Sequence, residues 1–345
     1  MISVDVEVVL KRYSEPTNNP VTGIVQKYLE KMEIRPNSVI TNIWGALHNE
    51  VTAIIIGDIP NYLLRYAQTM MEFGDKGVDG NVISCNKVIL LHGPPGTGKT
   101  SLCKALAQKL TVHMQGRFTS GLLIEINSHS LFSKWFSESG KLVNKMFSKI
   151  REVVENTNLL VCVLIDEIES LARARDQCIS GTEPSDSIRV VNTLLTQIDE
   201  IRSYKNVLIF ATSNMTETID LAFVDRADIK QFIGLPSVPA IYNIYLSCLE
   251  ELMKAQIIKE QPLERTHAIK EGNISLSEET KHLMSICEQS RGLSGRSLRK
   301  VPFIAHALFL DQSFSTLKNF LVAMENAVHK EITERQYFSL GKKEV

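Results

Sequence analysis

Five short apolar runs, separated by longer amphipathic segments, constrain the fold of this chain more than any other feature. Runs of this length and composition are typical of strands that are buried on both faces of a parallel sheet. Between the second and third runs, apolar residues recur at helical spacing over 142–154, which predicts a helix that covers the sheet. The alternation predicts an α/β domain with a five-stranded parallel sheet, its strands at 87–91, 122–126, 159–165, 207–212 and 229–233.

Two smaller regions are expected on either side of this α/β domain. Residues 2–10 alternate apolar and polar side chains as a half-buried strand does, and residues 21–32 follow helical spacing. The C-terminal part is helical only, with a polar loop expected at 259–275 and with Pro302 expected to kink or delay the helix at 303–310. The predicted domains are a short N-terminal α/β fragment at 1–47, the large α/β domain at 48–236 and a helical domain at 237–345.

Composition and charge argue against several classes of protein. The chain has 345 residues, of which 44% are hydrophobic and 22% charged, so it can bury a core. Its longest apolar run is far shorter than the roughly 20 residues that cross a bilayer, and the N-terminus lacks a secretory pattern, so we expect an intracellular protein without membrane association. The six cysteines include no C-x-x-C pair, which argues against zinc or disulfide frameworks. A net charge of −1 makes direct nucleic-acid binding a disfavoured reading.

A glycine-rich segment follows the first apolar run and matches the pattern G-x-x-x-x-G-K-[ST] between a predicted strand and a predicted helix. Glycines let backbone N–H groups wrap the phosphates of a nucleotide, and the helix N-terminus adds a positive dipole. Lys99 would reach the β- and γ-phosphates, and the Thr100 hydroxyl would bind Mg²⁺. A chance glycine-rich turn is disfavoured, because the motif occurs between a predicted strand and a predicted helix, as phosphate binding requires. The predicted ATP-binding residues are Gly93, Pro94, Pro95, Gly96, Thr97, Gly98, Lys99, Thr100 and Ser101.

Polar side chains follow the third and fourth apolar runs. The third leads directly into Asp166 and Glu167, and the fourth is followed by Asn214. Open α/β sheets bind ligands at the carboxyl ends of their strands, so these residues are candidates for catalysis. We expect Asp166 to hold Mg²⁺, directly or through water, and Glu167 to polarise the water that attacks the γ-phosphate. Asn214 would hydrogen-bond that water or the γ-phosphate, while an asparagine in an ordinary turn is the alternative.

Together these motifs resemble the AAA+ family of ATPases, in which a large α/β domain is followed by a small helical lid. The resemblance implies that residues 131–140 line the central pore of a hexamer. Trp135 and Phe136 would then contact a protein substrate, with Trp135 as the gripping residue. A buried tryptophan is the alternative, because tryptophan is commonly found in cores and interfaces.

The same resemblance implies a catalytic role for Arg226 as an arginine finger that completes the site of a neighbouring subunit. A structural ion pair of Arg226 with Asp225 or Asp228 is the alternative. A second arginine, usual in the family, is missing from this segment, and the sequence leaves open whether Arg189, Arg202 or no residue replaces it.

In the lid, the segment 292–296 resembles the family's sensor-2 turn, so Arg296 is implied to reach the γ-phosphate. Arg296, with the sequence of 93–109, 124–140 and 181–230, narrows the resemblance to one AAA+ branch. Members of that branch are homo-hexamers that remodel HORMA-domain proteins with a HORMA-like adaptor. The resemblance implies action in meiotic chromosome and recombination control and in the spindle checkpoint. It implies a location in the nucleus, on chromosomes, and in the cytoplasm, with the kinetochore as a further candidate.

Three functions are therefore compared. The first is an ATP-hydrolysing remodeller of HORMA-domain proteins. The second is an ATP-binding assembly module with impaired substrate recruitment, because the region at 1–47 is shorter than the recognition domain of the family. The third is a nucleic-acid-dependent AAA+ motor, for which Arg296, Arg299 and Lys300 would form a basic patch.

Overall fold

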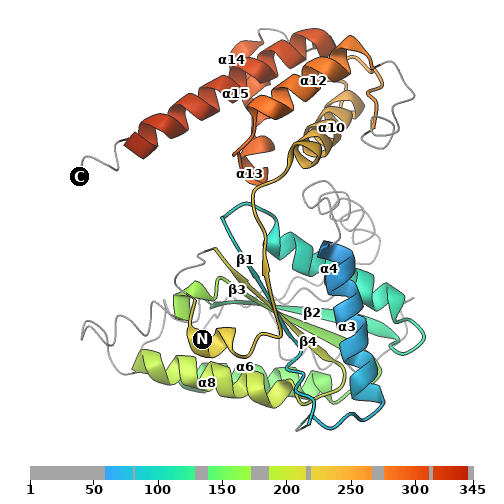
Figure 1. The fold of residues 1–345 in the computed structure, drawn as a ribbon, viewed down its shortest axis with the longest axis vertical. Helices are drawn as coiled ribbons and strands as arrows, with labels where there is room; N and C mark the ends of the chain where they lie inside the picture. The colour runs from blue at the N-terminus through green and yellow to red at the C-terminus, as the bar shows by residue number, and fades with distance from the viewer. Residues whose placement is uncertain are drawn as a thin grey trace. The chain divides into compact units, whose positions relative to one another are not determined.

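A computed structural model describes residues 59–80, 82–128, 139–171, 186–214, 219–265, 276–310 and 314–340. Within these ranges the chain divides into two compact units (Figure 1). The first contains residues 59–93 and 99–233, and the second contains residues 94–98 and 234–340. The expected strand and helix of 1–47 lie outside the described residues, as do Trp135 and Phe136.

The first unit is built around a five-stranded parallel sheet in the order β2-β3-β4-β1-β5, which confirms the predicted fold class. All five apolar runs form strands, because continuous apolar segments can be buried on both faces of a sheet. All residues of β3 are buried except the last, Asp166, which is partly exposed. The strands are β1 (Val88–His92), β2 (Ser120–Asn127), β3 (Leu159–Asp166), β4 (Val207–Ser213) and β5 (Ile229–Phe232).

The register aligns the carboxyl ends of neighbouring strands. Asn127 of β2 is paired with Asp166 of β3, and His92 of β1 is paired with Ser213 of β4. Residues that follow β1, β2, β3 and β4 therefore emerge at one edge of the sheet. This edge is where the sequence places its candidate site.

Helices cover the sheet and close the core of the first unit. The predicted helix at 142–154 is confirmed, and it packs beside a second helix on the same face of the sheet (Figure 1). Their buried side chains, such as Phe147 and Leu194, join those of β3 and β4 in one hydrophobic cluster. The helices of this unit are α3 (Ile59–Asp75), α4 (Lys99–His113), α6 (Ser139–Val154), α8 (Asp186–Ile201) and the short α9 (Leu221–Val224).

The second unit is a helical domain with its own core, as predicted for the lid. Pro302 neither kinks nor delays its helix, contrary to expectation: it lies in the first turn, where the missing N–H needs no partner. Residues 259–265 form no helix or strand, in agreement with the predicted loop, whose remainder lies outside the described ranges. The helices are α10 (Val238–Lys254), α12 (Glu278–Gln289), α13 (Gly295–Leu298), α14 (Val301–Phe309) and α15 (Leu317–Leu340).

None of the helices in the described part of the chain is both long and apolar enough to cross a membrane. No described cysteine is in a disulfide, and burial raises the pKa of the Cys162 thiol to about 12. That thiol is therefore protonated and packs as a small apolar side chain.

Candidate active site

The loop after β1 has glycine at three positions where a side chain would clash or strain the backbone. Gly93 has a φ of 142°, and a Cβ there would lie 2.2 Å from the carbonyl oxygen of Ile233. Its N–H donates to the carbonyl of Ser213 at 3.2 Å, which anchors the loop to the end of β4. Gly96 and Gly98 also have positive φ values, 75° and 89°. These conformations are accessible to glycine and strained for other residues.

Lys99 is the first residue of α4 and is almost completely buried, with 4% of its surface exposed. Its ammonium group donates to the carbonyl oxygen of Gly93 at 2.9 Å. The side chain therefore folds back toward Gly93, the residue that follows β1, from the first turn of α4. Ser101 follows in the first turn of the same helix. An ammonium beside a helix N-terminus forms a strongly electropositive site suited to phosphate.

His92 lies beside this cation. Burial lowers the pKa of His92, and the positive charge of Lys99 lowers it further. Its ring packs edge-on against Phe232 of β5, with the centroids 5.5 Å apart. The imidazole is therefore neutral at physiological pH, and it does not add to the positive charge at the loop.

Thr100 and Asp166, the two residues expected to hold Mg²⁺, lie in contact with one another. The Thr100 hydroxyl lies 3.2 Å and 3.3 Å from the two carboxylate oxygens of Asp166. Thr212, at the end of β4, donates a second hydroxyl hydrogen bond to the same carboxylate. The cluster offers hard oxygen donors from one carboxylate and its neighbouring hydroxyls. This donor set fits Mg²⁺, which is held by few protein oxygens together with phosphate and water.

Glu167 follows Asp166 with an unusual backbone. Its φ is 60°, which costs an L-residue of order 1–3 kcal/mol unless its surroundings enforce it. Its N–H donates to the hydroxyl oxygen of Thr212 at 3.4 Å. A conformation of this kind at the end of a strand is typical of active-site residues.

Asn214 is half-buried immediately after β4, the neighbour of β3. Its backbone N–H lies 3.3 Å from a carboxylate oxygen of Glu169. The fold thus brings Lys99, Thr100, Asp166 and Asn214 to the same edge of the sheet. Sequence reasoning did not single out Thr212 or Glu169, although both are polar residues at that edge.

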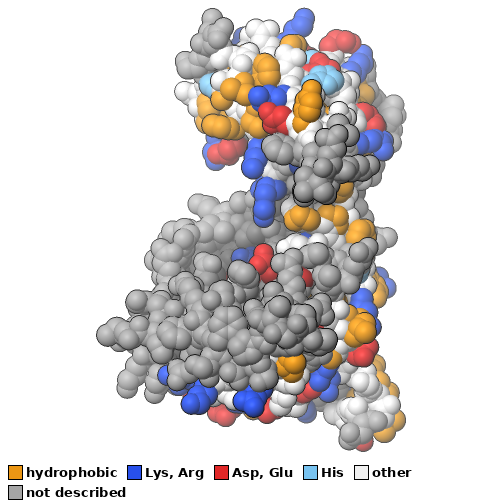
Figure 2. Space-filling view, turned by 90° about the vertical axis from the view of Figure 1, so that its left-hand side faces the viewer, with side chains coloured by type: hydrophobic (Ala, Val, Ile, Leu, Met, Phe, Trp, Pro, Cys, Tyr) orange, Lys and Arg blue, Asp and Glu red, His pale blue; other side chains and the backbone are white. Residues whose placement is uncertain are grey.

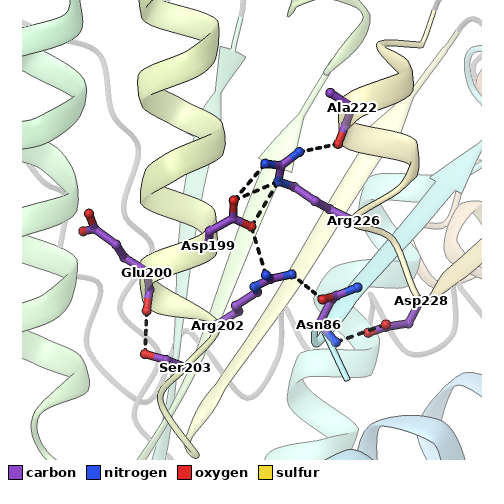
Figure 3. Close-up of polar contacts among 8 residues, drawn as sticks. All are labelled: Asn86, Asp199, Glu200, Arg202, Ser203, Ala222, Arg226 and Asp228. Carbon is purple, nitrogen blue, oxygen red and sulfur yellow. Dashed lines mark hydrogen bonds and ion pairs between the residues drawn. The ribbon is translucent and has the colours of Figure 1, made fainter. Parts of the chain in front are cut away.

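Arg226 is held within its own subunit by an ion pair with Asp199 of α8 (Figure 3). Its Nε lies 3.0 Å from Oδ1 of Asp199, its Nη2 lies 2.8 Å from Oδ2, and its Nη1 donates to the carbonyl of Ala222. This two-pronged geometry is the strongest arrangement of an arginine with a carboxylate. The partner therefore differs from the two aspartates considered in the sequence. The function of Arg226 as a finger stays a prediction.

Asp228, one of the two aspartates considered as partners of Arg226, forms hydrogen bonds with other residues. Asp228 accepts hydrogen bonds from the N–H of Asn86 at 3.0 Å and from the hydroxyl of Tyr66 at 2.7 Å. Asp199 instead serves two arginines, because Nη2 of Arg202 lies 3.4 Å from its Oδ1 (Figure 3). Two guanidinium groups are therefore gathered around one carboxylate at the end of α8.

We expect the Arg226–Asp199 pair to stabilise the first unit measurably. The two side chains are 26% and 31% exposed, so solvent screening is incomplete, and we expect a coupling energy of about 1 kcal/mol. Urea unfolding of Arg226→Ala, Asp199→Ala and the double variant measures it. The matched cycle with Arg202→Ala should give a smaller value, because that contact is single and longer. A coupling below about 0.3 kcal/mol for Arg226 would contradict the expectation.

Arg296 belongs to the second unit, which also contains residues 94–98. It is exposed and follows Ser294, whose hydroxyl caps α13 by accepting from the N–H of Ser297. Within this unit the backbone N–H of Arg296 donates to the carbonyl of Gly96 at 3.3 Å. The turn predicted as sensor 2 is thus in contact with the glycine-rich loop through its backbone.

Comparisons with known proteins agree with this geometry. Residues 89–235 match the profile of the ATPase family associated with various cellular activities (AAA), and residues 237–332 match the TRIP13-like, AAA+ ATPase lid C-terminal domain. The human pachytene checkpoint protein 2 homolog is 54% identical over 307 residues, which cover 88% of this chain and 70% of the human protein. The chain belongs to the pachytene checkpoint protein 2 family of AAA+ ATPases.

Further members of the pachytene checkpoint protein 2 family show the same similarity. The homolog from Danio rerio is 59% identical over 281 residues, which cover 80% of this chain and 66% of that protein. The solved structure of C. elegans PCH-2 has a TM-score of 0.72 and 40% identity, over 84% of this chain and 73% of PCH-2. The family and the AAA domain confirm two sequence predictions: the protein is an ATPase, and it binds nucleotide.

Proposed function

We propose that this ATPase works as a homo-hexamer that converts HORMA-domain proteins between closed and open conformers, together with a HORMA-like adaptor. Membership of the pachytene checkpoint protein 2 family supports the proposal. The observation that carries its chemistry is the contact of Thr100 with Asp166, next to Glu167, at the carboxyl edge of the sheet. We extend the proposal to meiotic recombination control and the spindle checkpoint, and to the nucleus, chromosomes, kinetochore and cytoplasm as locations.

The residues of the site divide the chemistry among them. Lys99 and the N-terminus of α4 bind the phosphates of ATP and offset their negative charge. Thr100 and Asp166 would hold Mg²⁺, which when bound neutralises charge on the β- and γ-phosphates. Glu167 accepts a proton from the attacking water, and Asn214 orients that water by hydrogen bonding.

Hexamer assembly is supported by the surface of the helical unit. Several large hydrophobic side chains on and beside α14 and α15 are exposed, and Figure 2 shows hydrophobic side chains among charged ones on this unit. Surfaces of this kind are commonly covered by a partner, and we assign the partner to a second copy of the chain. The side chains are Phe303, Leu308, Phe309, Phe314 and Val322.

In the assembled ring, Arg226 would act on the γ-phosphate of the neighbouring subunit and Arg296 on that of its own. For Arg226 this role requires its guanidinium to exchange at least part of the Asp199 pair for phosphate. Loss of the γ-phosphate on hydrolysis would release both arginines, and Trp135 and Phe136 would then move substrate through the pore.

The proposal predicts that a HORMA-domain substrate with its adaptor stimulates the steady-state ATPase rate of this chain. Trp135→Ala should abolish the stimulation and leave the basal rate unchanged, whereas Trp135→Phe, which keeps an aromatic ring, should retain part of it. A basal rate that ignores substrate would contradict remodelling and favour an assembly module. Stimulation by DNA or RNA, with salt-sensitive binding, would contradict it in favour of a nucleic-acid motor.

A further inference from the structure

A buried serine outside the recognised motifs lies against the backbone of Glu167. Ser128 follows the last residue of β2, and none of its surface is exposed. Its hydroxyl oxygen is 2.7 Å from the carbonyl oxygen of Asp166 and 2.6 Å from that of Glu167. A second hydroxyl, on Ser170, lies 2.8 Å from the Ser128 hydroxyl and 3.0 Å from the Glu167 carbonyl.

The number of available protons limits which of these groups can donate hydrogen bonds. Each serine carries one donor proton, and a carbonyl can only accept. Ser128 donates to the two carbonyls, which share its proton. The single proton of Ser170 is shared between the Ser128 hydroxyl oxygen and the Glu167 carbonyl. Hydrogen bonds arranged in a chain of this kind strengthen one another inside a protein.

The two carbonyls belong to the two peptide groups that flank the α-carbon of Glu167. The orientations of these planar groups define φ and ψ, the only soft backbone angles of a residue. The N–H of the first group is held separately by Thr212. One buried hydroxyl thus helps to fix both peptide groups of a residue whose φ is 60°.

The place of Glu167 in the fold distinguishes its positive φ from the positive φ values that are common in turns. Among the described residues, Lys87 and Gln256 are the other non-glycine residues with positive φ. Gln256 lies just after α10, where left-handed residues commonly end a helix. Glu167 instead ends a strand, beside the carboxylate of the candidate magnesium site. Its backbone conformation sets the direction of its Cβ and hence the region that its carboxylate can reach.

We propose that Ser128, supported by Ser170, is a positioning residue that holds the Glu167 carboxylate in its reactive orientation. Without the Ser128 hydroxyl, the two peptide groups keep their contacts with Thr212 and Ser170 but lose a restraint on both carbonyls. We therefore expect the Glu167 carboxylate to shift from its reactive position. Displacement of a catalytic group by about 1 Å can lower a rate about 100-fold. This inference rests on the proposed role of Glu167 as general base.

Ser128→Cys and Ser128→Ala test the inference in the 345-residue chain. The sulfur of cysteine is larger than the hydroxyl oxygen and is a weak donor, so both variants lose the hydrogen bonds, while alanine leaves space and cysteine fills the site more tightly. We expect kcat for ATP to fall about 10- to 100-fold in both, with the Kd for ATP within about twofold of wild type. Ser203→Ala is the control, because that hydroxyl donates to the Glu200 carbonyl in an exposed turn.

The result that overturns the proposal is a kcat within about twofold of wild type in Ser128→Cys, or a fall matched by an equal loss of ATP affinity. If the Ser128 variants do not fold, Ser170→Ala decides, because it keeps the Ser128 hydroxyl and removes its donor. An unchanged kcat in that variant overturns the proposal. Glu167→Gln, measured in parallel, distinguishes failure of the positioning role of Ser128 from failure of the general-base role of Glu167. If Glu167→Gln still hydrolyses ATP, the general-base role is wrong, and the inference that rests on it is wrong as well.

Discussion

Lys99→Ala should remove ATP binding from an otherwise folded chain. The ammonium of Lys99 is buried against the Gly93 carbonyl at the start of α4, so it meets phosphate in a site with little competing water. Hydrogen bonds to a charged group contribute up to about 3 kcal/mol, and we expect the Kd for ATP to rise about 100-fold or more. Isothermal titration or a fluorescent nucleotide measures this change.

Lys109→Ala is the matched control for this substitution. It removes the same charge from the same helix, ten residues and about 15 Å further along α4. The Kd of Lys109→Ala for ATP should stay within about twofold of wild type. The control therefore distinguishes a general effect of lost positive charge from the loss of a direct contact with phosphate. Equal affinities of the Lys99→Ala and wild-type chains would contradict the assignment of the glycine-rich loop as the phosphate site.

Glu167→Gln should bind ATP normally and hydrolyse it very slowly. The amide keeps the size of the side chain and cannot accept the proton of the attacking water, so the rate should fall by about 10² to 10⁴. Steady-state phosphate release gives the rate, and nucleotide titration gives the affinity. Unchanged affinity with a lost rate identifies a group that acts in the transition state.

Glu155→Gln provides the control for the loss of a carboxylate, because Glu155 is exposed just beyond α6. Its hydrolysis rate should equal that of the wild-type chain. A Glu167→Gln rate within about threefold of wild type would contradict the role of Glu167, since general bases contribute far more than this.

The sheet and the phosphate loop could be predicted because their physical requirements are local. A continuous apolar run is buried wherever it lies, and the conformation of Gly93 excludes any side chain because of the Ile233 carbonyl. Pro302 shows the limit of local rules. The rule that proline breaks helices does not hold there, because the helix begins one residue earlier, at Val301, and Pro302 lies in its first turn.

Contacts between distant segments could not be predicted in the same way. Thr212 meets Asp166 only because β4 lies next to β3, and strand order is not encoded in a local motif. Arg226 pairs with Asp199, 27 residues away, while the nearby Asp228 is occupied by Asn86 and Tyr66. Sequence proximity therefore favoured the wrong partner.

Ser128 carried no recognisable signal in the sequence. It belongs to no motif, and its significance follows from the 2.6 Å contact with the Glu167 carbonyl together with the positive φ of that residue. The importance of this buried hydroxyl depends on the backbone groups that it contacts. Those contacts follow from the register of β2 against β3, which the sequence does not show.

We propose that ATP hydrolysis at Asp166 and Glu167 drives a change of conformation in a HORMA-domain protein. The most direct measurement follows conversion of the closed conformer to the open one by ion-exchange chromatography, with the adaptor and MgATP present. We expect the wild-type chain to convert many substrate molecules per enzyme molecule and Glu167→Gln to convert none. Conversion that proceeds equally in Glu167→Gln, or its absence with a wild-type chain that hydrolyses ATP normally, would contradict it.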